Sequence, residues 1–342
     1  MNMKRILILI ISALLLFSAC HVKDDRSVRL GLIVDMAGVD DRSFNQGVYE
    51  GLLKAGSETG ARVTYLKPAD LSVSERISSM TDLTDRGYGF IVLPGYAFTD
   101  VIDIFAGYYP KTALSLIDIT LDKVPSDNVS VNIFREEQGG FLVGVAAALE
   151  IREGMLGFLG GIKIPPVMRY ETGFIQGIEY ANRNLGTSIV LDRSNFVYAG
   201  SFNDMALGNQ LGNALFSKGV KAVFIAAGPT GLGVINEAKN RRLMGNKVWV
   251  IGVDSDQYEL GELGDGTSCI LTSAMKNVSL AAYRDAMDFI EGNFRGGVIK
   301  YHGVENGGMG IPEKNPNLSD STLKSLDEVR RKIIGGAIIV RE

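Results

Sequence analysis

Short apolar runs alternate with amphipathic stretches along most of the chain. The first set of runs covers residues 30–34, 63–66, 90–93 and 113–117, and the second covers residues 155–159, 189–191, 222–227 and 248–253. In the first set, Gly, Pro or Asp lies at or near an end of each run, which favours short buried strands. Continuous apolar strands separated by helices are typical of parallel sheets covered on both faces. The pattern therefore predicts two α/β lobes.

Apolar residues between these runs repeat at helical spacing. One series is Phe44, Val48, Leu52 and Ala55, a second is Leu207, Leu211, Ala214 and Leu215, and a third is Tyr283, Met287, Ile290 and Phe294. Residues 303–319 are rich in Gly, Pro and Asn, which argues against a long regular element there. Residues 323–334 are predicted to form a last helix, and residues 337–340 are a candidate final strand.

The first twenty residues have the features of a secretory signal. Two basic residues precede an apolar run at residues 6–17, which is too short to span a ~30 Å hydrocarbon core. The Ser-Ala-Cys that follows resembles a bacterial lipobox, although Phe17 stands where most lipoboxes carry leucine. We expect residues 1–19 to be removed as a signal peptide, a lipid on Cys20 to anchor the protein to a membrane, and residues 20–27 to form a tether. The alternative is ordinary signal cleavage, with the cysteine incidental.

Charge and composition argue against several classes of function. The formal net charge is −4 and the isoelectric point is about 5.5, so binding of nucleic acid has no electrostatic support. Two cysteines and two histidines are too few for a usual zinc site, and we expect neither a metal nor a cofactor. His21 lies in the tether and His302 is isolated, so a Ser-His-Asp triad is not expected. The composition fits binding better than catalysis.

Residues that follow the predicted strands are candidates for ligand contacts. In open α/β sheets, ligands bind in the crevice beyond the carboxyl ends of the strands. The residues at or near these ends are Asp35, Gly95, Asp118, Gly228 and Asp254. An alternative is that Asp and Gly only start turns there. The carboxylates among them, with Asp256, also leave a glycosidase-type reaction open.

Two clusters of polar and aromatic residues, one in each half of the chain, lie near these strand ends. Residues 40–45 include Phe44 and Asn45, and residues 201–204 include Phe202. Aromatic faces stack on flat ligands, and carboxylates accept hydrogen bonds from hydroxyl or amine donors. The clusters predict a two-sided clamp, with helix capping and core packing as the alternative explanations.

A glycine-rich loop and one lysine complete the candidates. Residues 228–233 join a predicted strand to a helix, but they match neither the dinucleotide nor the Walker pattern, and Pro229 lacks a backbone donor. Close backbone approach to a neutral ligand is therefore favoured over phosphate binding. Lys276 is a lone cation in an apolar stretch, and its interpretation as a surface lysine stays open.

Several motifs along the chain resemble those of the PnrA-like basic membrane proteins. They occupy residues 40–46, 141–147, 228–234, 250–257, 271–276 and 310–316, in family order. The resemblance implies the type I periplasmic-binding-protein fold, in which two doubly wound lobes are joined by a three-crossing hinge. We expect the crossings near residues 131, 274 and 305. The expected lobe 1 contains residues 28–131 and 274–305, and the expected lobe 2 contains residues 132–273 and 306–342.

Members of that family are substrate-binding lipoproteins that deliver nucleosides to ABC transporters. The resemblance implies that Phe44 and Phe202 sandwich a purine ring and that Asn45 and Asp118 hydrogen-bond the base. It also implies that Asp254 and Lys276 hold the ribose hydroxyls. Gly228 would approach the ligand by its backbone, and Asp35 would line the cleft. Our hypothesis is a receptor without enzymatic activity that is lipid-anchored in the bacterial cell envelope and presents inosine, guanosine or adenosine to a permease. The alternatives are a sugar-binding receptor of the same fold, a nucleosidase or glycosidase, and a surface adhesin.

Overall fold

The computed structural model describes residues 27–121 and 123–342. The predicted signal peptide at residues 1–19, the lipid attachment at Cys20 and most of the tether lie outside this part of the chain. Among the described residues, no helix has the length and apolar character needed to cross a membrane.

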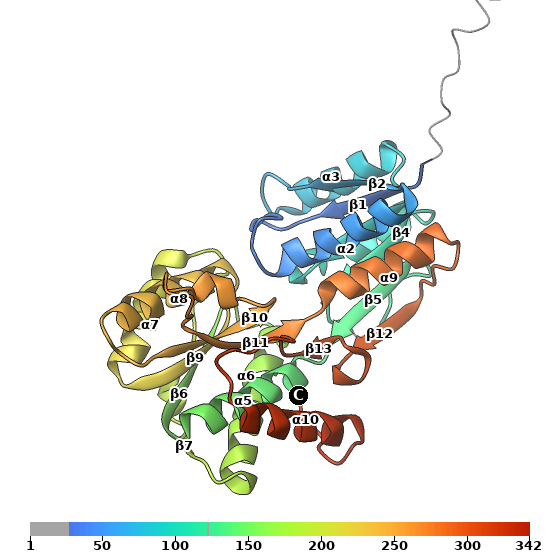
Figure 1. The fold of residues 1–342 in the computed structure, drawn as a ribbon. Coiled ribbons are helices and arrows are strands. Elements are labelled where there is room, and N and C mark those ends of the chain that lie inside the picture. The colour runs from blue at the N-terminus through green and yellow to red at the C-terminus, as the bar shows by residue number, and fades with distance from the viewer. Residues whose placement is uncertain (1–26, 122) are drawn as a thin grey trace, which may run out of the picture.

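The first lobe is built on a parallel sheet of six strands with the order β12-β5-β4-β3-β1-β2. Its strands are β1 (Arg29–Ile33), β2 (Arg62–Leu66), β3 (Phe90–Pro94), β4 (Ala113–Ile117), β5 (Val129–Phe134) and β12 (Val298–His302). Its helices are α2 (Phe44–Thr59), α3 (Val73–Asp85), α4 (Ile102–Tyr108) and α9 (Val278–Ile290), with a 3-10 turn η1 (Tyr96–Phe98). Alternate strand residues point to opposite faces of the sheet, so both faces are apolar. Helices α2 and α9 lie side by side on one face (Figure 1), and α3 and α4 pack on the other.

The second lobe is built on a seven-stranded sheet with the order β13-β11-β10-β9-β6-β7, and β8 pairs with β6. Its strands are β6 (Glu153–Gly160), β7 (Ser188–Val190), β8 (Phe196–Tyr198), β9 (Val220–Ala226), β10 (Trp249–Asp254), β11 (Ile270–Lys276) and β13 (Met309–Gly310). Its helices are α5 (Glu136–Ile151), α6 (Pro165–Asn184), α7 (Met205–Ser217), α8 (Pro229–Leu243) and α10 (Asp320–Ile334), with the 3-10 turns η2 (Arg193–Asn195) and η3 (Tyr258–Gly261). Only β13, which pairs with β11, is antiparallel among the described strand pairs. Helices α7 and α8 cover one face, and α5, α6 and α10 cover the other.

The chain passes between the two sheets three times. It leaves the first sheet after β5, returns to the first lobe after β11, and leaves it again after β12 through the 3-10 turn η4 (Val304–Asn306). Strands β5 and β11 extend beyond residues 131 and 274, where the first two crossings were expected. Residues 132–134 pair in the first sheet and residues 274–276 in the second, so these two crossings come about three residues later.

The candidate strand at residues 337–340 is wrong, because this segment has no strand partner among the described residues. The chain turns after α10, and the backbone N–H of Ile338 donates to the carbonyl of Lys332. The backbone of Arg341 then pairs with the side-chain amide of Gln176 on α6. Ile338 and Val340 pack partly buried against the main core, whereas Ile339 is exposed.

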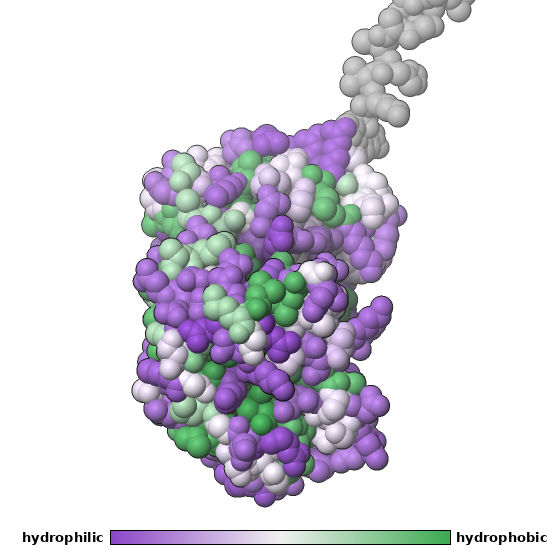
Figure 2. Space-filling view, turned by 60° about the vertical axis from the view of Figure 1, so that its left-hand side comes forward, coloured by the Kyte–Doolittle hydropathy of each residue, from purple (hydrophilic) through white to green (hydrophobic). Residues whose placement is uncertain are grey.

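The surface visible in Figure 2 is mostly polar, and its apolar side chains occur in small groups between charged ones. The helices cover the large apolar faces of both sheets.

Candidate functional site

A pocket lies at the carboxyl ends of the strands of both sheets, between the two lobes. All eight predicted ligand-binding residues line it: Asp35, Phe44, Asn45, Asp118, Phe202, Gly228, Asp254 and Lys276. The other lining residues are Ala37, Asp41, Gly95, Tyr96, Ile164, Pro166, Val167, Tyr170, Ala226, Ala227, Pro229 and Val253. The empty space amounts to about 680 Å³, part of it open to solvent.

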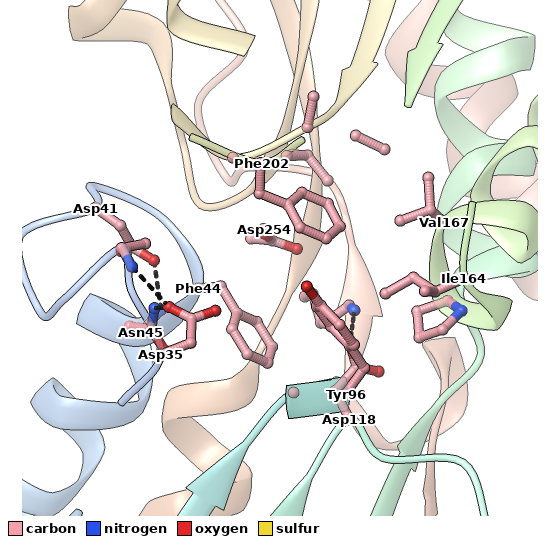
Figure 3. Close-up of a pocket in the computed structure, with 18 of the residues that line it drawn as sticks. Asp35, Asp41, Phe44, Asn45, Tyr96, Asp118, Ile164, Val167, Phe202 and Asp254 are labelled. Atoms are coloured by element: carbon pink, nitrogen blue, oxygen red, sulfur yellow. Dashed lines mark hydrogen bonds and ion pairs between the residues drawn. The ribbon is translucent and has the colours of Figure 1, made fainter. Parts of the chain in front are cut away.

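The two sheets contribute to this pocket in equivalent ways. Strands β4 and β10 hold the same place in the two strand orders, and each is followed or ended by an aspartate. Asp118 and Asp254 both adopt a left-handed backbone conformation, with φ of 61° and 63°. Such a conformation is strained for a residue other than glycine and is concentrated at functional sites. Both carboxylates are thereby turned into the cleft (Figure 3).

The start of α2 is organised by two aspartates. Asp41 accepts the backbone N–H groups of Ser43, Asn45 and Gln46 at 2.8–3.1 Å, so it caps the helix. Burial raises the pKa of Asp41 to about 6, against the effect of these hydrogen bonds. Asp35 accepts the side-chain amide of Asn45 at 2.8 Å. This leaves Oδ1 of Asn45 buried without a donor among the described residues, at the wall of the pocket.

Aromatic rings enter the pocket from both lobes. Phe44 on α2 and Tyr96 after β3 come from the first lobe, and Phe202 before α7 comes from the second (Figure 3). The rings of Tyr96 and Phe202 are 6.1 Å apart between centroids, at an angle of 46°. A glycine makes room for one of the rings, because a Cβ at Gly161 would collide with the ring of Phe202. The arrangement suits a flat ligand that stacks on aromatic faces.

Lys276 is buried at the floor of the pocket, with 4% of its surface exposed, so it is not a surface lysine. Its Nζ lies 2.6 Å from Oδ2 of Asp118 and 2.9 Å from Oε1 of Glu136. The same ammonium group lies 5.6 Å from the ring centre of Phe44 and 5.3 Å from that of Tyr170. Burial alone would lower the pKa of Lys276, but the carboxylates raise it above its usual value, so the ammonium stays charged.

The two aspartates differ in their electrostatic surroundings. Burial would raise the pKa of Asp118, but Lys276 and its other partners outweigh that effect and lower it. Burial raises the pKa of Asp254, whose carboxylate accepts the hydroxyl of Ser43 at 2.9 Å and that of Tyr170 at 3.5 Å. Oδ1 of Asp118 has no hydrogen-bond donor among the described residues, although it is buried. A ligand that donates hydrogen bonds can satisfy this oxygen.

Sequence reasoning missed several residues of the site. Tyr96 stands directly after Gly95, so the rule on strand ends could have found it. Tyr170 and Arg169 lie on α6, and Glu136 follows a strand that was not predicted, so no sequence signal placed them here. In residues 27–121 and 123–342, no group of three or more His, Cys, Asp or Glu side chains is arranged to hold a metal ion.

Comparison with known proteins identifies the family. The family model for PnrA-like ABC transporter substrate-binding proteins matches residues 28–342. The chain is 34% identical over 331 residues to the CD4+ T-cell-stimulating antigen of Listeria monocytogenes, covering 94% of this chain and 90% of the relative. It is 30% identical over 332 residues to the ABC transporter nucleoside-binding protein BmpA of Lactococcus lactis, with coverages of 93% and 90%. It is 31% identical over 322 residues to basic membrane protein B of Borreliella burgdorferi, with coverages of 92% and 88%.

A solved structure supports the same assignment. The ABC transporter solute-binding protein of Aeropyrum pernix K1 superposes with a TM-score of 0.79 at 27% identity, covering 92% of this chain and 94% of that chain. The two doubly wound lobes agree with a type I periplasmic-binding fold. The chain belongs to the PnrA-like family of ABC transporter substrate-binding proteins.

Proposed function

We propose that this protein captures purine nucleosides in the cleft between its lobes and delivers them to an ABC permease. The observation that carries the proposal is the combination of aromatic rings from both lobes with buried oxygens that lack donors, on Asn45 and Asp118. A purine base offers two faces for stacking and N–H donors at its edge. The printed name of the Lactococcus lactis relative, a nucleoside-binding protein, supports the same ligand class.

The proposed placement assigns one part of the ligand to each group of residues. Phe44 and Phe202 stack on the two faces of the base, while Asn45 and Asp118 bind its edge. Asp254 and Lys276 hold the ribose hydroxyls, Gly228 approaches the ligand by its backbone, and Asp35 lines the cleft. Four carboxyl groups line the pocket beside one lysine, which disfavours the negative charge of a nucleotide phosphate. The ligand is therefore an uncharged nucleoside.

Capture works by closure of the two lobes about the three crossings, a hinge motion that needs no chemical step.

In this proposal residues 1–19 are a signal peptide and a lipid on Cys20 tethers the protein to the membrane that holds the permease. Lobe 1 contains residues 28–134 and 277–302, and residues 135–276 and 303–342 form lobe 2 and the crossings. Retention of a Cys20→Ser variant in the membrane fraction would contradict the lipid anchor.

Calorimetry with inosine, guanosine, adenosine, cytidine, ribose and inosine 5′-monophosphate tests the ligand class. We expect purine nucleosides to bind with micromolar or tighter affinity, the monophosphate to bind much more weakly, and the nucleoside to be recovered intact. Preferred binding of ribose would indicate a sugar receptor, and release of free base would indicate a nucleosidase.

The clamp itself is tested by Phe202→Ala. Loss of one stacking face is expected to weaken nucleoside binding by roughly 1–3 kcal/mol, about 5- to 150-fold. Tyr108→Ala, at an exposed position outside the pocket, is the control and should leave the affinity unchanged. Unchanged affinity in Phe202→Ala would show that this ring belongs to the core and not to the clamp.

A further inference from the structure

A chain of buried charged groups continues from the pocket into the hinge. Nε of Arg169 lies 2.6 Å from Oε2 of Glu136, whose Oε1 lies 2.9 Å from Nζ of Lys276. The side chains of Arg169, Glu136 and Lys276 are 7%, 0% and 3% exposed, so water screens these contacts little. Glu136 and Arg169 are not among the residues that line the pocket, and nothing in the proposed ligand placement uses them.

The place of Glu136 in the fold is equivalent to that of Lys276. Strands β5 and β11 hold the same position in the two strand orders, and each leads into a crossing between the lobes. Glu136 is the first residue of α5, two positions after β5, and Lys276 is the last residue of β11. Their ion pair therefore joins the first crossing to the second. Oε1 of Glu136 receives no hydrogen bond in the described structure. Burial and Asp118 raise the pKa of Glu136 to about 8, while Lys276 and Arg169 act in the opposite direction.

We propose that Glu136, held from behind by Arg169, is a positioning residue that orients Lys276 toward the ligand. The proposal rests on the proposed function, because it assumes that Lys276 contacts the nucleoside. With only Asp118 as a close partner, the ammonium group would be held by one contact and could turn from its place at the floor of the pocket. Glu136 supplies a second carboxyl contact on the hinge side, and Arg169 prevents Glu136 from turning away. A long side chain fixed at two points loses less conformational freedom when the ligand binds.

A double-mutant cycle on nucleoside affinity tests this proposal, because a merely structural role gives independent effects. We expect Glu136→Gln to weaken binding about tenfold in the otherwise native protein. In the background of Lys276→Gln the same substitution should change the dissociation constant by less than twofold, since there is no ammonium left to orient. Glu137→Gln is the matched control, because Glu137 is a neighbouring buried carboxyl on the same helix turn without a contact to Lys276, and it should leave affinity within twofold.

The proposal would be overturned if the effects of Glu136→Gln and Lys276→Gln on the dissociation constant simply multiply. An unchanged affinity in Glu136→Gln would overturn it as well. Arg169→Lys, which keeps the charge but loses the planar hold on Glu136, provides a second variant and should weaken binding only when Lys276 is present. If thermal unfolding shows that neither variant folds, Glu136 serves the fold and the proposal is overturned. Absence of nucleoside binding in the native protein would instead reject the proposed function itself.

Discussion

His302 ends β12, and its imidazole is 6% exposed and stacked on Phe134 at a centroid distance of 4.8 Å. Its Nε2 lies 2.8 Å from Oδ1 of Asn132, whose amide donates to Asp285 at 2.8 Å. Because Oδ1 of Asn132 can only accept, the imidazole Nε2–H donates to it, and the lowered pKa of His302 keeps the ring neutral near pH 7. The network shows how single polar residues can be buried in the first sheet when each finds a partner.

This network predicts a stability that falls in mild acid. Burial lowers the pKa of His302 from 6.5 to about 4, so the unfolded chain binds a proton more readily than the folded one. The neutral ring contributes up to about 3 kcal/mol to the free energy of unfolding. This contribution is complete above pH 6.5 and is lost as the pH falls toward 4. Urea unfolding between pH 4.5 and 7.5 measures this, with His302→Gln, which keeps an N–H donor, as the control. Equal pH slopes in both proteins would contradict the prediction.

At the scale of elements, helices α5 and α6 approach each other so closely that their backbones touch. A Cβ at Gly140 or Gly144 of α5 would collide with the carbonyl oxygens of Tyr170 or Phe174 on α6. Gly173 and Gly177 of α6 are packed in the same way against the carbonyl oxygens of α5. This close approach brings the start of α5 against α6, and it allows Glu136 and Arg169 to meet beneath the pocket.

Gly144→Ala is therefore expected to lower the free energy of unfolding by about 1–3 kcal/mol, because the backbone of α6 has to move. The same substitution at Gly107 of α4 is the matched control, since a Cβ there meets nothing within 4 Å. The control should stabilise the protein by up to about 1 kcal/mol through helix propensity. Urea denaturation compares the two variants, and a neutral Gly144→Ala would show that the two helices can separate at little cost.

The elements also show what the sequence could and could not predict. The predicted apolar strands are present, with ends shifted by at most two residues, because their runs are mostly apolar. Strand β5 was missed because Ser130 and Asn132 interrupt its apolar run; both side chains are fully buried, and the amide of Asn132 donates to Asp285 on α9. The rule that ligands lie beyond strand ends found Asp35, Asp118, Gly228 and Asp254, and the role of Lys276 came from the family resemblance. Glu136 could not be predicted, because its position depends on β5 and on the packing of α5 against α6.

At the scale of the whole molecule, the two lobes touch across the cleft as well as through the hinge. The hydroxyl of Ser43 in the first lobe donates to Oδ2 of Asp254 in the second at 2.9 Å. The hydroxyl of Ser255 donates to the carbonyl of Arg42 at 3.2 Å. These contacts lie beside the pocket and exist only while the lobes are close, so they favour the closed form.

Ser43→Ala removes the contact to Asp254 and is expected to weaken nucleoside binding about tenfold, as a hydrogen bond to a charged group is lost in the closed form. Calorimetry measures the affinity, and small-angle X-ray scattering should show a more open ligand-free protein. Ser57→Ala is the control, because the Ser57 hydroxyl bonds only to the carbonyl of Lys54 within α2. An equal affinity in the Ser43 and Ser57 variants would show that closure does not depend on this contact.

The three crossings also govern the order in which the protein can be assembled during synthesis. Phe90 at the centre of the first sheet stacks on Phe289 of α9 at a centroid distance of 5.3 Å, and β12 supplies the edge beside β5. A ribosome makes the first five strands of this sheet long before it reaches residues 278–302. Domains usually fold in order from the N-terminus as they emerge. Here the first lobe cannot complete its core until nearly all of the second lobe has been synthesised, so the two lobes reach their final state almost together.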